Sequence, residues 1–204
     1  MAKIATYGTD STPSLSDKVI GTDVSDSNNT KNYVISDLAQ LINETAVYTP
    51  VLAASSDITQ EPSGIGVATQ VSFGAAQSNS TLTLAANGLV TFLETGSYII
   101  NGYGSVERQG SSGGVSIFLF RFLVDGVQVG NTKGFHLDST DIVFPYEITF
   151  PLDITTVGTT ISFEIMRDDT GSGNGKNQGG LYPHSNASGW SNVPSADLNI
   201  WKLQ

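Results

Sequence analysis

The sequence predicts an all-β protein, a sandwich or jelly roll, preceded by an extended arm. Three observations carry this prediction. Hydrophobic residues make up 39% of the chain and charged residues only 14%, with 22 Gly, which is a composition typical of β proteins. Short apolar runs recur along most of the chain, and Gly, Asn and Asp turns separate them. Alternating strands and helices are not found, so a parallel α/β sheet is not expected.

Residues 1–45 are predicted to form the extended arm. Its apolar residues come in short groups, which are too far apart to bury one another. These groups contain Ile4, Tyr7, Val19, Ile20, Tyr33, Val34 and Ile35. The arm is expected to order on something else, because it has no core of its own.

A short helix over 37–44 is predicted at the end of the arm. Ser36 is the expected N-cap, and Asp37 suits the positive end of a helix. Leu38, Leu41 and Ile42 then share one face. A helix of this length is marginal alone, so this face needs a partner.

Residues 46–64 are predicted to be a linker, since Pro50 and Pro62 interrupt them and they show little periodicity. The β domain is predicted over residues 65–204. Its strands are expected at 67–75, 80–86, 88–94, 96–106, 115–124, 127–137, 141–152, 159–167 and 196–203.

A long loop from Asp168 to Ser195 breaks the rhythm of strands. It is rich in Gly, Asn and Ser, and it carries Tyr182, His184 and Trp190. Loops of this length in compact domains are commonly functional. We therefore expect these three side chains to form a contact surface; the alternative is that a ring folds back to anchor the loop.

Candidate catalytic residues are few. The chain has 2 histidines, His136 and His184, and lacks a phosphate-binding loop and a His-Glu-x-x-His helix. We expect no enzymatic activity and no cofactor. Calcium binding stays open as an alternative, because acidic side chains recur at two places, although neither has the spacing of an EF-hand loop. These places are Asp168 with Asp169 and Asp138 with Asp141.

Charge and cysteine content limit the partners. The net charge is −10, spread over the chain, so phosphate backbones should repel the protein and no nucleic acid is expected. No apolar run approaches the length of a membrane span, and no membrane insertion is expected. The absence of cysteine fits assembly in a reducing cytosol.

A pattern resembling the C1q/TNF-like jelly roll runs through the β domain. It is carried by TQVSFGAA, GLVTFLETGSYIINGYGSV, FLVDGVQVG, FPLDITTVGTTISFEI and SADLNIWKL. Phe73, Phe92, Gly96 and Tyr98 match the opening strands of that family. The "TVGT" turn departs from the family, which usually has an acid after the glycine.

This resemblance implies a homotrimer, in which three inner sheets pack around a threefold axis. It assigns YIINGYGSV, TISFEIM and LNIWKL to the inner sheet. The expected subunit interface is then formed by Tyr98, Ile100, Tyr103, Phe163 and Trp201. The rival interpretation is a sandwich core that closes completely within one copy.

The strand SIFLFRFLV is unusual because both of its faces are apolar. Phe118, Phe120 and Phe122 point one way, and Ile117 and Leu119 point the other. The resemblance places this strand in the outer sheet. Its second face is expected to be covered by a loop, by the arm of a neighbour or by another protein.

The arm is similar to N-terminal segments of tailed-bacteriophage virion proteins, especially fibres. The similarity lies in STPSLSDKVIGTDVSDSNNTKNYVISDLAQLI, in which an Asp-Lys-apolar-apolar-Gly-Thr-Asp stretch precedes Thr-Lys-Asn-Tyr and a short helix. It implies a virion-docking arm. The expected docking residues are Ile4, Tyr7, Val19, Ile20, Tyr33, Leu38 and Leu41.

These observations favour a non-enzymatic virion protein, a homotrimeric head-fibre or tail-fibre subunit located in the virion and assembled in the host cytoplasm. Its partners would be other virion proteins and, through the Tyr182, His184 and Trp190 loop, a host-surface glycan or protein. One alternative is a capsid decoration, cement or adaptor protein that stabilises the particle. Another is a secreted C1q-like lectin or signalling ligand.

Overall fold

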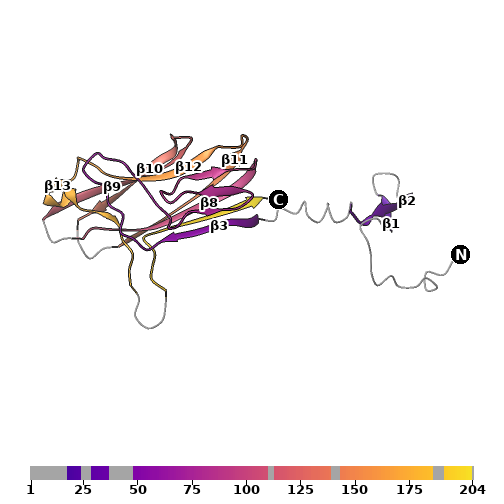
Figure 1. The fold of residues 1–204 in the computed structure, drawn as a ribbon, viewed down its shortest axis with the longest axis horizontal. Helices are drawn as coiled ribbons and strands as arrows, with labels where there is room; N and C mark the ends of the chain where they lie inside the picture. The colour runs from indigo at the N-terminus through magenta and orange to yellow at the C-terminus, as the bar shows by residue number, and fades with distance from the viewer. Residues whose placement is uncertain are drawn as a thin grey trace. The chain divides into compact units, whose positions relative to one another are not determined.

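The computed structural model describes residues 18–23, 29–36, 48–109, 113–138, 143–185 and 191–203 (Figure 1). The chain divides into two compact units. The first is Met1–Val47 together with Gln204, and the second is Tyr48–Leu203.

In the first unit, the described residues form a β-hairpin. β1 (Lys18–Asp23) pairs with β2 (Asn29–Val34) in an antiparallel register that sets Val19 opposite Tyr33 and Ile20 opposite Asn32. A two-stranded sheet is marginally stable in water. The hairpin therefore gains stability if its apolar pair packs against a further surface.

Several arm residues with a predicted role lie outside the described residues. These are Ile4, Tyr7, Leu38 and Leu41, and the helix predicted over 37–44 lies there with them. Docking by the arm stays a prediction.

The second unit is a sandwich. One of its sheets, called the β8 sheet, has the strand order β11–β8–β15–β3, and the short β14 (Gly180–Leu181) pairs with β8. The bounds are Phe144–Ile154 for β11, Gly96–Glu107 for β8, Ala196–Leu203 for β15 and Tyr48–Ser56 for β3.

The other sheet, called the β9 sheet, has the order β10–β9–β12–β7–β6–β5. Its bounds are Val127–Leu137 for β10, Gly114–Val124 for β9, Thr160–Arg167 for β12, Val90–Phe92 for β7, Leu82–Leu84 for β6 and Gln77–Ser78 for β5. Two short strands extend it: β4 (Thr69–Gln70) pairs with β12, and β13 (Ser172–Gly173) pairs with β9. A 3-10 turn, η3 (Asn174–Asn177), follows β13.

The chain crosses repeatedly between the two sheets. The chain enters the β8 sheet with β3, passes to the β9 sheet for β6 and β7, and returns to the β8 sheet with β8. It then forms β9 and β10 in the β9 sheet. The last three long strands alternate: β11 lies in the β8 sheet, β12 in the β9 sheet and β15 in the β8 sheet. The final strand, β15, inserts between β8 and β3. This connectivity is that of a jelly roll, so the predicted all-β jelly-roll sandwich is confirmed.

The prediction of a linker over 46–64 is wrong for much of its length, because Tyr48–Ser56 forms β3. Its inward residues Leu52, Ala54 and Ser56 are buried, and the residues between them are exposed. Pro50 is tolerated because β3 is the edge strand of its sheet. Ala54 and Ser56 are small, so the alternation of inward and outward residues is weak in the sequence of this strand.

Phe163 of β12 lies at the centre of the core. Its ring centroid is 5.0 Å from that of Phe122, 5.5 Å from Phe120 and 5.6 Å from Phe73, and all four rings are almost completely buried. Gly102 of the opposite sheet makes room for them, since a Cβ there would lie 3.0 Å from the Phe163 ring. Both sheets therefore meet at one aromatic cluster.

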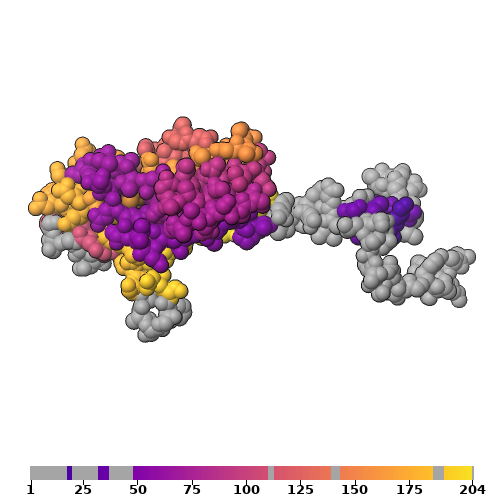
Figure 2. Space-filling model, in the orientation of Figure 1, coloured from indigo at the N-terminus to yellow at the C-terminus, as the bar shows by residue number. Residues whose placement is uncertain are grey.

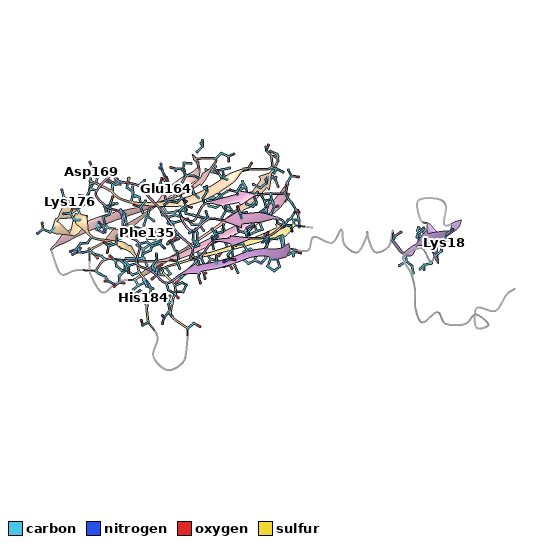
Figure 3. All side chains as sticks on the ribbon, viewed as in Figure 1. Lys18, Phe135, Glu164, Asp169, Lys176 and His184 are labelled. Atoms are coloured by element: carbon cyan, nitrogen blue, oxygen red, sulfur yellow. The ribbon has the colours of Figure 1, made fainter. Side chains whose placement is uncertain are left out.

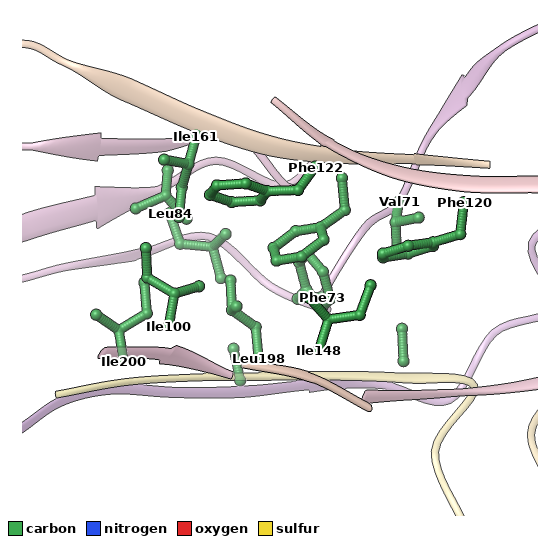
Figure 4. Packing of buried hydrophobic residues seen from close by; sticks show 14 of the residues in the cluster. Val71, Phe73, Leu84, Ile100, Phe120, Phe122, Ile148, Ile161, Leu198 and Ile200 are labelled. Atoms are coloured by element: carbon green, nitrogen blue, oxygen red, sulfur yellow. The ribbon is translucent and has the colours of Figure 1, made fainter. Parts of the chain in front are cut away.

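The rest of the core is aliphatic. Figure 4 shows Ile100, Leu198 and Ile200 rising from the β8 sheet towards Leu84 and Ile161 of the β9 sheet. Each such side chain contributes about 1.5–3 kcal/mol when it is fully buried.

The second apolar face of β9 is covered only in part. Ile117 and Leu119 are half-buried, and Arg121 donates from Nε to Glu164 Oε2 at 2.7 Å. A shallow groove of about 220 Å³ remains over Leu119 and Met166; its walls include Gly66 and Ala68 on one side and Gln128 and Thr132 on the other. The loop that carries Gly66 and Ala68 is therefore one cover of this face.

Tyr146 of β11 buries a hydroxyl that has no hydrogen-bond partner among the described atoms. An unpaired buried hydroxyl costs about 1–3 kcal/mol. We expect Tyr146→Phe to raise the free energy of unfolding by about 1 kcal/mol in urea titrations. Gly104→Ala should lower it, because a Cβ at Gly104 would overlap the Tyr146 ring. A less stable Tyr146→Phe variant would contradict this account.

Candidate subunit interface

The outer face of the β8 sheet is the candidate functional site. Along β8, side chains alternate between the two faces. Tyr98 and Ile100 point into the core and are 1% and 0% exposed, whereas Ile99, Asn101 and Tyr103 lie on the outer face and are partly exposed.

Strand pairing arranges the outward residues of the four strands into three rows across the sheet. Read from β11 to β3, the rows are Glu147, Tyr103, Asp197 and Ser55; Thr149, Asn101, Asn199 and Ala53; and Pro151, Ile99, Trp201 and Pro50. The first two rows are mainly polar and the third is apolar.

The polar rows are linked by hydrogen bonds. Asn101 Nδ2 donates to Glu147 Oε1 at 2.7 Å and to Thr149 Oγ1 at 2.9 Å. Burial, and then the carboxylate of Asp57, raises the pKa of Asp197 above its ordinary value. This end of the face is acidic, and its side chains are ordered by their own contacts.

The apolar row lies at the opposite end of the face, where β3 begins and β15 ends. Trp201 and Ile99 are half-buried, and Pro151 and Pro50 are exposed. Lys202, on the inner side, donates to Glu94 Oε2 at 2.5 Å, and that hydrogen bond raises the pKa of its ammonium group. The apolar row therefore forms a patch near the start of β3.

The predicted interface is wrong in three of its residues. Tyr98, Ile100 and Phe163 are core residues, and Phe163 stands on β12, in the other sheet. Only Tyr103 and Trp201 lie on the outer face. The error arose because both rows of β8 begin with bulky apolar residues, so the sequence did not fix which row points inward.

Sequence analysis also missed Ile99 and Pro151, which extend the apolar row. One signal was available in β15. There Ala196, Leu198 and Ile200 alternate with Asp197 and Asn199, which fixes the inward face and places Trp201 on the outward one.

The loop residues expected to contact a receptor have different positions. Tyr182 is only 3% exposed, and its hydroxyl donates to Glu61 Oε1, so it anchors the loop; its assignment as a receptor contact is wrong. His184 is half-exposed at the loop base, and Trp190 lies outside the described residues. The part of the loop drawn in yellow projects from the body of the sandwich in Figure 2.

Arg167 holds the segments around this loop together. It is 6% exposed, and it donates to the carbonyl oxygens of Gly179 (2.8 Å) and Pro62 (3.0 Å) and to Glu61 Oε2 (2.9 Å). A buried guanidinium with all these partners is a structural tie. Loss of it would leave the carbonyl oxygens of Gly179 and Pro62, both buried residues, without this donor.

The candidate calcium ligands do not converge within the described residues, where no group of three or more His, Cys, Asp or Glu side chains is found. Asp168 instead accepts hydrogen bonds from the hydroxyl and the amide of Thr170, which lower its pKa. Asp141 lies outside the described residues. In the described part of the chain, no helix is long and apolar enough to cross a membrane.

The protein is therefore a jelly-roll sandwich in which the outer face of the β8 sheet is apolar at one end and polar at the other. No family model matches the chain, and no curated protein matches it. Among solved structures, the Eiger TNF of S. frugiperda is similar, with a TM-score of 0.35 and 14% identity over 76% of this chain and 94% of that chain. The fold assignment rests on the strand order described above.

Asp197 gives a test of the acidic end of the face. Because its pKa is raised on folding, the folded state binds a proton more tightly than the unfolded chain. Its contribution to stability is therefore present at low pH and is lost as pH rises through the carboxyl range. We expect Asp197→Asn to raise the free energy of unfolding at neutral pH and to flatten its pH dependence in urea titrations.

Asp57→Asn is the matched variant, since it removes the second cause of the shift. It should act in the same direction and by less. An Asp197→Asn variant that is less stable than the natural chain at neutral pH would show that the charged carboxylate has a favourable partner.

Proposed function

We propose that the protein is a non-enzymatic structural component of a bacteriophage particle, a homotrimeric fibre-type subunit that docks on the virion through its N-terminal unit. The observation that carries the homotrimer is the apolar row of Ile99, Trp201, Pro151 and Pro50 on the outer face of the β8 sheet. This row lies on one face of the four-stranded β11–β8–β15–β3 arrangement.

The energetics favour covering the row. Full burial of an exposed Ile side chain contributes about 1.5–3 kcal/mol. Ile99 and Trp201 are already half-buried, so each contact of a closed ring would add the remaining part of such a contribution. On the same face, polar rows ordered by hydrogen bonds lie beside the apolar row.

Virion docking is supported by the first unit. Its sequence is similar to N-terminal arms of phage fibres, and its described hairpin of β1 and β2 has no third strand among the described residues. The Val19 and Tyr33 pair would gain from an external partner, because Val19 is 43% exposed. The docking partner would be another virion protein.

The mass in solution tests the trimer. Light scattering of the full chain should give about three times the 21.5 kDa of one copy. Trp201→Asp and, independently, Ile99→Asp should shift the mass towards one copy, because a carboxylate in the contact is desolvated without a partner. A monomeric natural chain at micromolar concentration would refute the trimer.

Val127→Asp is the matched control. Val127 is 68% exposed on β10, the edge of the β9 sheet, so the same substitution there should leave the mass unchanged. Far-ultraviolet circular dichroism separates loss of assembly from loss of folding. If the Trp201→Asp and Ile99→Asp chains do not fold, Trp201→Ala is used in their place, because it removes the contact without adding a charge.

The arm is tested by shortening the chain. A chain that begins at Tyr48 keeps all of β3, and it should still form trimers but should not sediment with phage particles that lack the protein. The full chain should sediment with them. Sedimentation of the shortened chain would place the docking surface on the sandwich and would favour a decoration or cement protein.

A further inference from the structure

The loop between β14 and β15 leaves the sandwich through a narrow base. His184 and Val193 face each other there: the His184 amide donates to the Val193 carbonyl at 2.9 Å, and the Val193 amide donates back at 2.8 Å. Figure 3 places His184 at the root of the projecting loop. These two backbone hydrogen bonds close the loop base.

One side-chain contact accompanies them. His184 Nε2 lies 3.4 Å from Glu107 Oε2, at the end of β8. Both atoms are buried, and neither has a hydrogen-bond partner among the described atoms. Two buried polar atoms without partners are costly, and here the two atoms lie within ion-pair distance of each other.

A hydrogen on Nε2 lets the imidazole donate towards the carboxylate. A second proton, on Nδ1, makes the ring an imidazolium, and its positive charge strengthens that contact. A metal ion would need further protein ligands, and the described residues hold no third His, Cys, Asp or Glu at this place.

We propose that His184 and Glu107 form a proton-dependent clamp on the base of the loop. When the imidazole is protonated, the ion pair adds to the two backbone hydrogen bonds and the loop base is closed. When the imidazole is neutral, the contact with Glu107 loses the charge of the cation, and the base opens more often. Histidine is the side chain whose charge changes near neutral pH.

The other charged groups around the pair are already engaged. Tyr182, at the start of the loop, interacts electrostatically with Glu107, but its hydroxyl donates to Glu61. Glu61 is held by Arg167 of β12. Arg108, next to Glu107 on β8, donates to Gln178 and to the Leu137 carbonyl. None of these hydrogen bonds reaches Nε2 of the histidine.

Hydrogen–deuterium exchange of the full chain tests the clamp, with a chelator present and with correction for intrinsic exchange rates. Amides at the loop base should be about two- to fivefold more protected near pH 6 than near pH 8, the factor typical of a partly exposed ion pair. His184→Gln and Glu107→Gln should lower the protection near pH 6 to the level near pH 8.

Two further variants sharpen the test. His184→Lys keeps a cation at both pH values, so its loop base should be protected at both. His136→Gln changes the other histidine, which is exposed on β10, and should behave as the natural chain. Equal protection of the natural chain at both pH values would overturn the proposal, as would protection that appears only when Zn²⁺ replaces the chelator.

Discussion

The packing of Phe163 against Gly102 is the contact on which the arrangement of the sandwich depends. The ring reaches across the core because the opposite strand offers no side chain at that point. It gathers Phe73, Phe120 and Phe122 around itself. Since a strand has only two faces, fixing Gly102 inward also fixes Ile99, Asn101 and Tyr103 outward. The candidate interface is therefore a consequence of the core.

This dependence explains what the sequence could and could not predict. Most long strands were predicted because β-branched and aromatic runs stand between Gly, Asn and Asp turns. β3 was missed because its inward positions hold small residues and Pro50 interrupts it. The inward row of β8 was assigned to the interface because Tyr98 and Ile100 are as apolar as surface contacts would be. Only tertiary packing distinguishes the inward row of β8 from its outward row.

The loop region shows a similar limit. Composition marked Tyr182 and His184 as functional, since large rings are unusual in a Gly-rich loop. Tyr182 instead reaches Glu61, which is 121 residues away, and Arg167 ties the same carboxylate to Pro62 and Gly179. Partners so distant in the sequence leave no local pattern. His184 faces Glu107 for the same reason, because β14 pairs with the end of β8.

Charge sets the conditions under which copies can share the outer face. Each copy carries a net charge of −10, so copies repel one another beyond contact, and this repulsion is screened within about 8 Å at physiological salt. The apolar row acts only at contact, where Ile99 and Trp201 lose water. The row of Glu147, Tyr103 and Asp197 lies at the other end of the same face. The free-energy cost of desolvating its carboxylates would exceed the free energy gained from new contacts there. In the proposed trimer, a stable contact would therefore close at the apolar end and keep water at the acidic end, with its centre close to the start of β3.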